Sequence, residues 1–254
     1  MPRMMDARKG IYFVSDVHLG LDVGDPAGRE AAFVDFLRAI PAETTRALYL
    51  LGDIWDFWYE YKDVVPKGYA RVFAALQDLM DAGVEVCFFR GNHDMWCFHY
   101  FESLGIKILE QPYLMEASGK VFCLDHGDGL GPGMRGYKLL RAVFRNRGAQ
   151  WLFSLLHPRI AFAIARRWSR SSRLARKEAY VFRGEDEPLY KYCRDFALQH
   201  KVDYFIFGHL HARADVTLPS GARLLVLKDW IDGPDYIYFD GITTVSGHSL
   251  KIEK

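Results

Sequence analysis

Five apolar runs of β type, each ending at a short polar motif, limit the folds open to this chain. The runs cover residues 11–15, 47–51, 84–89, 121–125 and 204–207. The polar side chains that follow them are Asp16, His18, Asp53, Asn92, His126, His209 and His211. Stretches with helical periodicity, at 29–40 and 69–80, separate the first three runs. This alternation predicts an α/β fold with right-handed βαβ units and parallel strands, whose carboxyl ends bring the polar motifs together.

These seven side chains are carboxylates, an amide and imidazoles, with no thiolate among them. The mixture suits divalent first-row metals such as Mn, Fe or Zn and is unlike a purely structural zinc site. Seven ligands are too many for one tetrahedral ion, but they fit two ions about 3.5–4 Å apart, the arrangement of hydrolases that attack phosphorus. Asp53 is the candidate bridge, with Asp16, His18 and His211 on one ion and Asn92, His126 and His209 on the other.

The spacing within the motifs supports this assignment. We expect His211 to join Asp16 and His18 because alternate residues of an extended segment point the same way. The glycines that flank the motifs allow tight turns and a close approach of the backbone. A single D-x-H or G-D match is weak evidence, since most such matches are turns. Five motifs in this order at five strand ends are not a chance pattern.

The order D-x-H, G-D-x-x-D, G-N-H-D, H-G-D and G-H-x-H resembles the calcineurin-like metallophosphoesterases, and the resemblance extends over the whole core. It implies a four-layer α/β/β/α sandwich with two metal ions. Within that superfamily, the aromatic run 53–58, the segment 136–138 and a basic helical insertion before G-H-x-H are similar to the UDP-2,3-diacylglucosamine hydrolases of lipid A synthesis. One departure is His93, since proteobacterial members of that group carry Arg after the metal-binding Asn.

The expected architecture is a single domain over residues 1–254, with a helical basic cap at residues 134–200 inserted into it. The net charge of the whole chain is only +1. Residues 134–183, however, contain thirteen Lys and Arg against one acid, a net charge of +12, and the remainder carries −11. So uneven a distribution indicates a functional surface.

Two groups of side chains in the cap are candidates for substrate contact. At helical spacing on one face lie Arg166, Ser169, Arg173 and Arg176. Guanidinium groups in such a row can clamp a diphosphate, and the alternative is a solvated face. An apolar stripe precedes them, formed by Trp151, Leu152, Leu155, Ile160, Phe162, Ala163 and Ile164. The stripe can hold acyl chains, lie in a membrane interface or pack the cap onto the core. The resemblance adds Tyr137 as a substrate-binding residue.

The resemblance implies hydrolysis of a phosphoanhydride, UDP-2,3-diacylglucosamine, to UMP and 2,3-diacylglucosamine 1-phosphate. Two divalent ions, with Mn as the first choice, would supply hydroxide near neutral pH for in-line attack on phosphorus. We expect His93 to stabilise charge on the phosphoryl group and Asp94 to orient His93. Asp56 and Asp128 are expected to orient the metal ligands in the same way.

Two other functions fit the same motifs. A phosphoesterase acting on a nucleotide, a nucleic acid or a phosphoprotein would keep the chemistry. Nucleic acid suits the chain less well, because aliphatic rather than exposed aromatic side chains interleave the basic segment. A scaffold with the same fold would bind partners without catalysis, but all seven ligand positions are intact.

The location that we expect is the cytoplasm, with peripheral association at the inner face of the membrane. Residues 1–10 lack the apolar core of a signal peptide, and no run of about 20 mostly apolar residues is present. The four cysteines show no C-x-x-C spacing and are expected to be buried, reduced thiols. The oligomeric state does not follow from the sequence.

Overall fold

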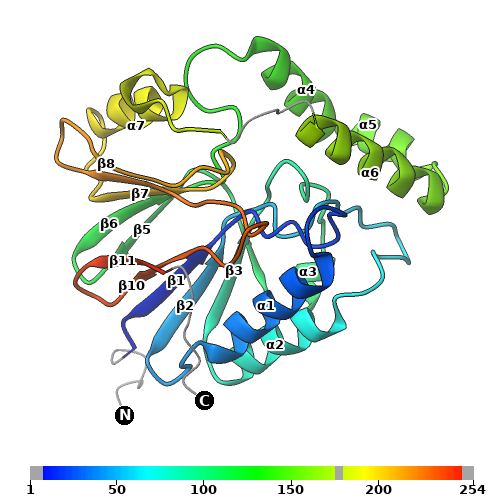
Figure 1. Cartoon of the computed structure of the whole chain (residues 1–254), viewed down its shortest axis with the longest axis horizontal. Helices are drawn as coiled ribbons and strands as arrows, with labels where there is room; N and C mark the ends of the chain where they lie inside the picture. Colours follow the sequence, from blue (N-terminus) through cyan, green and yellow to red (C-terminus); the bar gives the residue numbers. More distant parts are fainter. Residues whose placement is uncertain (1–7, 175–179, 248–254) are drawn as a thin grey trace.

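The computed structural model describes residues 8–174 and 180–247, which form two β-sheets packed face to face with helices outside them (Figure 1). The first sheet has the strand order β11-β10-β1-β2-β3-β4. Its strands are β1 (Gly10–Val14), β2 (Thr45–Leu50), β3 (Glu85–Phe89), β4 (Lys107–Leu109), β10 (Tyr236–Phe239) and β11 (Thr244–Gly247). Strands β1 to β3 are parallel, as expected, and β4, which we did not predict, continues the parallel order, whereas β10 and β11 pair antiparallel at one edge.

The parallel strands of the first sheet are connected by α1 (Pro26–Ala39), α2 (Ala70–Asp81) and the short α3 (Tyr100–Ser103). Helix α1 begins three residues before the expected position because its start is defined by capping rather than by apolar spacing. The carboxylate of Asp25 accepts a hydrogen bond from the Gly28 N–H at 2.9 Å, and Pro26 occupies the first turn.

The second sheet has the strand order β5-β6-β7-β9-β8. Its strands are β5 (Tyr113–Ala117), β6 (Lys120–Leu124), β7 (Tyr204–Phe207), β8 (Ala214–Thr217) and β9 (Arg223–Val226). Strands β6, β7 and β9 are parallel, and β5 and β8 pair antiparallel with them. The second sheet therefore also sends three strands toward one end of the sandwich.

Apolar side chains fill the spaces between the layers. Between the sheets, Phe13 stacks on Tyr49 with 5.5 Å between ring centroids and on Phe122 of the second sheet with 5.9 Å. On the outer face of the first sheet, α1 and α2 bury Phe33 and Leu76 completely. Burial of such side chains stabilises the fold by about 1.5–3 kcal/mol each. The α/β/β/α sandwich that we expected is confirmed.

The cap consists of α4 (Arg135–Arg145), α5 (Arg147–Ser154) and α6 (Pro158–Leu174), which extend beyond the two sheets (Figure 1). Asn146 separates α4 from α5, because its extended backbone ends one helix and its side chain accepts from the Ala149 N–H at 3.0 Å. No helix in the described ranges is long and apolar enough to cross a bilayer.

Helix α7 (Pro188–Ala197), preceded by the 3-10 turn η2 (Gly184–Asp186), lies apart from the cap helices (Figure 1). Its Leu189 and Cys193 are buried in a cluster with Phe205 and Phe207 of β7. Our expectation that the cap extends to residue 200 is therefore wrong at its C-terminal end. Helix α7 is the outer layer of the second sheet, because the parallel connection from β6 to β7 needs a helix on that face.

Candidate active site

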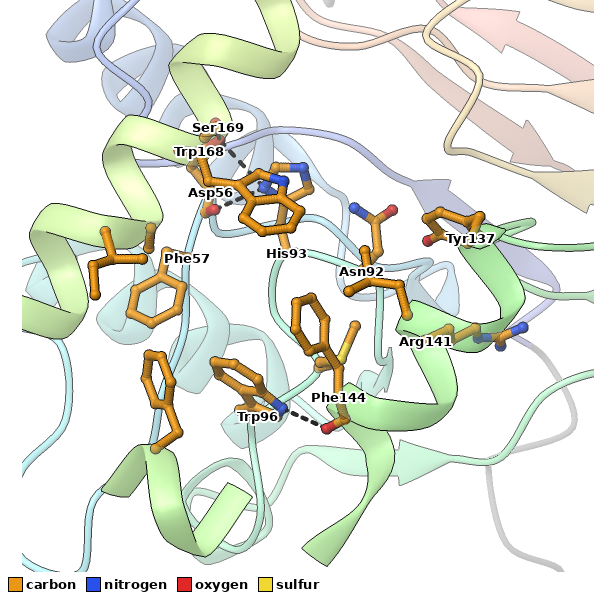
Figure 2. Close-up of a pocket in the computed structure, with 15 residues that line it drawn as sticks. Asp56, Phe57, Asn92, His93, Trp96, Tyr137, Arg141, Phe144, Trp168 and Ser169 are labelled. Carbon is orange, nitrogen blue, oxygen red and sulfur yellow. Dashed lines mark hydrogen bonds and ion pairs between the residues drawn. The ribbon is translucent and has the colours of Figure 1, made fainter. Parts of the chain in front are cut away.

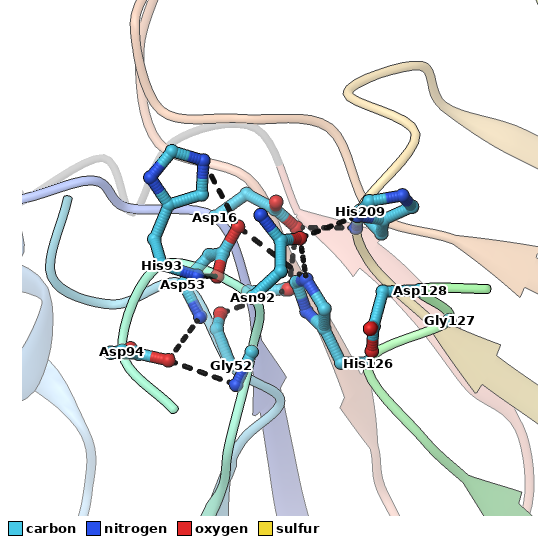
Figure 3. Close-up of polar contacts among 12 residues, drawn as sticks. Asp16, Gly52, Asp53, Asn92, His93, Asp94, His126, Gly127, Asp128 and His209 are labelled. Carbon is cyan, nitrogen blue, oxygen red and sulfur yellow. Dashed lines mark hydrogen bonds and ion pairs between the residues drawn. The ribbon is translucent and has the colours of Figure 1, made fainter. Parts of the chain in front are cut away.

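The seven predicted ligands lie together where strands of both sheets end, and Figure 3 shows five of them, Asp16, Asp53, Asn92, His126 and His209. Asp16 follows β1, Asp53 follows β2 and Asn92 follows β3. His126 follows β6 and His209 follows β7 of the second sheet. The expected convergence at the carboxyl ends of parallel strands is thus present in the structure.

Five of the seven predicted ligands have a left-handed backbone, which residues other than glycine rarely adopt. Their φ angles are 53° at Asp16, 49° at His18, 53° at Asp53, 68° at His209 and 56° at His211. Each such conformation costs about 1–3 kcal/mol, which the surrounding fold must offset. This geometry corrects our reasoning for His211. It reaches Asp16 as expected, but through a sharp turn rather than along an extended segment.

Asp16, His18, Asp53 and His211 form a first group of ligands. Each offers one atom that lies within 4.8 Å of the others. His211 Nε2 is 3.3 Å from Asp16 Oδ1, and His18 Nε2 is 3.6 Å from the same oxygen. Asp53 Oδ2 is 3.9 Å from His18 Nε2. The four side chains therefore surround one point.

Asp53 also belongs to a second group, with Asn92, His126 and His209. Asn92 Oδ1 is 3.2 Å from His126 Nε2 and 2.9 Å from His209 Nδ1 (Figure 3). His126 Nε2 is 3.4 Å from Asp53 Oδ2, the oxygen that also faces His18. Asp53 thus lies between the two groups, where a bridging ligand is needed.

Acceptor atoms face one another in these groups. The Leu51 carbonyl oxygen, which can only accept, is 2.8 Å from His126 Nδ1 and makes that nitrogen the donor of the neutral ring. His126 Nε2 then directs a lone pair at Asp53 Oδ2 and Asn92 Oδ1. Within residues 8–174 and 180–247, Asp16 Oδ1 and Asp53 Oδ2 are buried without a hydrogen-bond partner. Buried acceptors that converge in this way need cations, so the donor set fits two divalent ions.

The electrostatics of the site also favour cations. Burial raises the pKa of Asp53, but the charge of His126 and a hydrogen bond with its ring outweigh burial and hold this pKa well below its usual range. Burial lowers the pKa of His126, but the charge of Asp53 outweighs it and raises this pKa well above its usual value, so His126 Nε2 faces Asp53 with either a proton or, in its place, a metal cation. Burial and the charge of His126 lower the pKa of His209 to about 4. Ionised carboxylates beside a neutral imidazole are the protonation states that metal ligands require.

Two glycines allow the motifs to approach one another. A Cβ added to Gly91 would overlap the backbone nitrogen and the carboxylate of Asp53. A Cβ added to Gly208 would overlap the side chains of Ser15 and Asp16. The glycine at the start of G-N-H-D and of G-H-x-H is therefore required for contact with a ligand of another motif.

His93 lies beside both groups. Its Nδ1 is 2.9 Å from the backbone carbonyl oxygen of Asp56, and its Nε2 is 4.0 Å from Asp53 Oδ2. Burial lowers the pKa of His93, although Asp53 and Asp56 act against this. The ring is therefore neutral near pH 7 and faces the space next to the bridging carboxylate.

Asp94 has a different role from the one we expected. Its buried carboxylate accepts hydrogen bonds from the backbone N–H groups of Asp53, Ile54, Trp55 and Gly91. The expectation that Asp94 orients His93 is therefore wrong, because His93 is held by Asp56. Asp94 instead ties the loop after β3 to the loop after β2, and so sets the distance between Asn92 and Asp53.

Two carboxylates contact the imidazole ligands of the first group from outside. Asp56 Oδ1 is 3.4 Å from His18 Nδ1, in agreement with the orienting role that we expected. Asp229 Oδ2 is 2.9 Å from His211 Nδ1, a contact that sequence reasoning missed. The only signal for Asp229 was its place shortly after the apolar strand β9, the pattern of the other motifs.

Asp128 anchors the cap. Its Oδ2 accepts a hydrogen bond from the Tyr137 hydroxyl at 3.1 Å and lies 2.9 Å from Arg141 Nε. Tyr137 and Arg141 lie one turn apart on α4. These contacts differ from the expected one, in which Asp128 orients a metal ligand. Tyr137, predicted to bind substrate, lies beside the site, and Arg141 is an additional residue there that sequence reasoning missed.

An apolar pocket opens between the cap and the metal motifs (Figure 2). Asp56, Asn92 and His93 lie at its polar end. Its apolar lining comprises Phe57, Met95, Trp96, Leu140, Phe144, Phe153, Ile164 and Trp168. The aromatic run after Asp53 is therefore divided, since Phe57 lines this pocket while Trp55 and Trp58 are fully buried in the core.

The predicted basic face over residues 166–176 is described only in part. Arg166 is exposed, while Ser169 is buried and donates to Asp56 Oδ1 at 2.7 Å. The side chain of Arg173, and Arg176 altogether, lie outside the described residues. The structure therefore brings Ser169 to the site and leaves the arginine clamp a prediction.

Most of the apolar stripe of the cap is exposed. The exposed members are Trp151, Leu152, Leu155, Ile160, Ala163 and Ile164, of which Ile164 also lines the pocket. Phe162 instead packs on Phe57, with 5.1 Å between ring centroids. Packing onto the core therefore does not account for this stripe, and the interpretations that remain are acyl chains and a membrane interface.

The amino-acid sequence matches one protein family and several described bacterial relatives. The family described as calcineurin-like phosphoesterase matches residues 10–213. A Porphyromonas gingivalis protein described as UDP-2,3-diacylglucosamine hydrolase is 37% identical over 254 residues, covering 94% of this chain and 97% of the relative. Relatives with the same description from Stenotrophomonas maltophilia and Aeromonas salmonicida are 34% and 32% identical. The alignments cover 87% of this chain in both cases and 90% and 85% of the relatives.

Proposed function

Since this chain belongs to the calcineurin-like phosphoesterase family, we propose that it hydrolyses UDP-2,3-diacylglucosamine to UMP and 2,3-diacylglucosamine 1-phosphate. The observation that carries this proposal is the apolar pocket whose polar end is formed by Asn92 and His93. A substrate for such a site has a phosphate group directly next to bulky apolar groups, as a nucleotide-linked diacyl sugar does. The descriptions of the relatives from three bacterial genera support the same substrate.

The two ligand groups would hold two divalent ions, with Mn as our first choice for this donor set. When bound, such ions would lower the pKa of a water molecule and neutralise charge on phosphoryl oxygens. Asp53 joins the two positions, and Asp94 holds the loops of Asp53 and Asn92 together. The two loops therefore keep both ligand groups close enough together to act on the same phosphate.

His93 would move a proton at the reacting phosphate. The Asp56 carbonyl oxygen makes Nδ1 the protonated nitrogen of the neutral ring, so Nε2 carries the lone pair on the side of Asp53. Nε2 can take up a proton and, once the ring is charged, donate it to a phosphoryl or leaving oxygen. General acid–base catalysis of this kind contributes roughly 10²–10⁴-fold to rate.

The substrate proposal is tested by release of UMP, measured by ³¹P NMR on purified protein supplied with Mn²⁺. UDP-N-acetylglucosamine, which has the same anhydride without long acyl chains, is the control. We expect the diacyl substrate to react at least about 100-fold faster at low concentration, since its chains bury apolar surface in the pocket. Equal rates on both compounds would refute the proposal and favour a nucleotide phosphoesterase. Two bound ions without hydrolysis of any phosphoester would favour a scaffold.

The arginine clamp predicted from the sequence has a separate test. Charge reversal at Arg166, Arg173 and Arg176 should raise KM for the diacyl substrate and leave hydrolysis of bis(p-nitrophenyl) phosphate unchanged, because the small compound needs only the metal site. Each charge-assisted contact is worth about 1.5–3 kcal/mol, so the separation should be large. Equal loss on both compounds would mean that the cap only supports the fold.

We further propose that the cap rests on the inner face of the membrane. Leu139 on α4, Trp151 and Leu152 on α5, and Leu155 after it are each more than 60% exposed. Exposed apolar side chains beside a dense basic segment suit a surface of anionic lipid. Sedimentation with vesicles containing anionic lipid should be lost when Trp151 and Leu152 are replaced by Ser. Unchanged sedimentation of that variant would contradict this placement.

A further inference from the structure

Ser169 of the cap and Asp56 of the core join α6 to the metal motifs. Ser169 Oγ donates to Asp56 Oδ1 at 2.7 Å, and both residues are buried (Figure 2). The same Oδ1 is 3.4 Å from His18 Nδ1 and 3.6 Å from His93 Nδ1. One carboxylate oxygen therefore meets a cap hydroxyl, a predicted metal ligand and the predicted catalytic imidazole.

The two imidazoles depend on Asp56 for their orientation. The rings of His18 and His93 meet edge to face, with 4.9 Å between centroids and 89° between planes. His93 Nδ1 also faces the Asp56 backbone carbonyl at 2.9 Å, so both polar neighbours of that nitrogen belong to one residue. A displacement of the Asp56 carboxylate would therefore act on both rings.

The hydroxyl of Ser169 is unsuited to hold a phosphate while this contact exists. A serine hydroxyl has a single proton, and here it is directed at Asp56. Phosphate and acyl carbonyl oxygens are acceptors and need that proton. The direct substrate contact that we expected of Ser169 would therefore require the bond to Asp56 to break.

A further metal ion is the alternative explanation for this cluster, because His18, Asp56 and His93 offer atoms within 4.8 Å of one another. Such an ion would use His18 Nδ1 while His18 Nε2 faces Asp16 and Asp53. The ring would then have to lose its last N–H proton. A carboxylate that orients a neutral imidazole needs no such deprotonation and is the common arrangement beside metal ligands.

We propose that Ser169 is a positioning residue, which through Asp56 sets the orientation of His93 and His18 and so makes catalysis depend on the placement of α6. This inference rests on the phosphoesterase chemistry of the proposed function, but not on its lipid substrate. The test therefore uses a small substrate, bis(p-nitrophenyl) phosphate, which is hydrolysed without help from acyl chains.

The kinetic test compares Ser169→Ala and Ser169→Thr with wild type. We expect Ser169→Ala to lower kcat on the small substrate about 10-fold with little change in KM, which corresponds to about 1.4 kcal/mol in the barrier. Ser169→Thr keeps a hydroxyl and should restore most of the rate. The matched control is Ser154→Ala on α5, since its hydroxyl donates to the Trp151 carbonyl of its own helix at 2.6 Å rather than to a carboxylate of the site. It should behave as wild type.

Two further readouts separate positioning from a merely structural role. In ¹⁵N-histidine-labelled protein without added metal, the ring signals of His93 should shift in Ser169→Ala and not in Ser154→Ala. In a His93→Ala background, Ser169→Ala should cause little further loss, because residues that act through one another are not additive.

Three results would overturn the proposal. They are unchanged His93 signals, fully additive losses in the double variant, and a Ser169→Ala effect confined to KM for the diacyl substrate, which would make Ser169 a direct substrate contact. If wild type hydrolyses the small phosphodiester but not UDP-2,3-diacylglucosamine, the proposed function fails while these comparisons still decide the role of Ser169.

Discussion

Removal of the Asp229 carboxylate should weaken the binding of one metal ion and leave the binding of the other unchanged. Asp229 is only 8% exposed, and its Oδ2 holds His211 Nδ1 at 2.9 Å. This contact turns His211 Nε2 toward Asp16 Oδ1, 3.3 Å away. Outer partners of a metal-binding histidine change metal affinity by about 10–100-fold. Asp229→Ala should therefore raise the Kd of the first ion by that factor, or about 1.4–2.7 kcal/mol.

The second ion should bind as in wild type, because the side chains of the second ligand group are oriented by contacts that do not involve Asp229. His126 is held by the Leu51 carbonyl, and His209 Nδ1 meets Asn92 Oδ1. The measurement is titration of metal-free protein with Mn²⁺ in competition with a chelator, fitted with two sites. Asp232→Ala is the matched control, since this nearby carboxylate is exposed and pairs with Lys228 on the surface. It should leave both affinities unchanged.

Either of two results would refute this reasoning. Equal weakening of both ions would show that Asp229 supports the whole site rather than one ligand. Two ions bound with wild-type affinity would show that the turn at His211 holds the ring without help. In the second case the left-handed backbone at His211 would be the dominant constraint on the ligand.

His93→Ala should keep both ions and lose about 10²–10⁴-fold in kcat, and metal analysis beside turnover checks this. Loss of an ion in that variant would make His93 a ligand. Gly91→Ala should lower metal content and activity together, because its Cβ overlaps the loop after β2, whereas Gly136→Ala meets open space and should change neither. Near-normal metal content in Gly91→Ala would disprove the close approach. Burial raises the pKa of Glu187, but hydrogen bonds led by that from Arg183 outweigh burial and lower it. The stabilisation is therefore present above the unfolded-state pKa and lost as pH falls through the folded-state pKa. Glu187→Gln should lower the free energy of unfolding by roughly 1 kcal/mol at pH 7 and by much less at pH 3, as measured by denaturation, and an equal loss at both pH values would contradict this.

The set of predicted ligands and the parallel βαβ units were accessible from the sequence because both depend on local patterns, whereas the four-layer sandwich was expected from the resemblance to a known family. An apolar run that ends at Asp16, Asp53 or Asn92 shows where a parallel strand ends, and parallel strands end on the same side of a sheet. The bridging position of Asp53 follows from the same rule, since β2 lies between β1 and β3 in the sheet. Spacing along the chain was sufficient for these features.

Other features depend on residues that are far apart in sequence and meet only in the folded protein. Ser169 and Asp56 are 113 positions apart, and nothing near either residue indicates the hydrogen bond between them. Asp94 lies next to His93 in sequence, yet its carboxylate contacts the loop after β2. Helix α7 shows the same helical periodicity as the cap helices, but it packs on the second sheet and forms its outer layer.

The backbone conformation of the ligand residues was likewise not predictable from the sequence. Sequence spacing placed His211 with Asp16 and His18, but the left-handed turns that bring them together are conformations that Asp and His rarely adopt. Only contacts from the rest of the fold can hold such turns, among them the close approach that Gly91 and Gly208 allow. The sequence by itself thus determined which residues form the predicted ligand set and which strands they follow. The tertiary structure alone decided how each ligand is oriented and how the cap is connected to it, because those contacts join segments that the sequence separates.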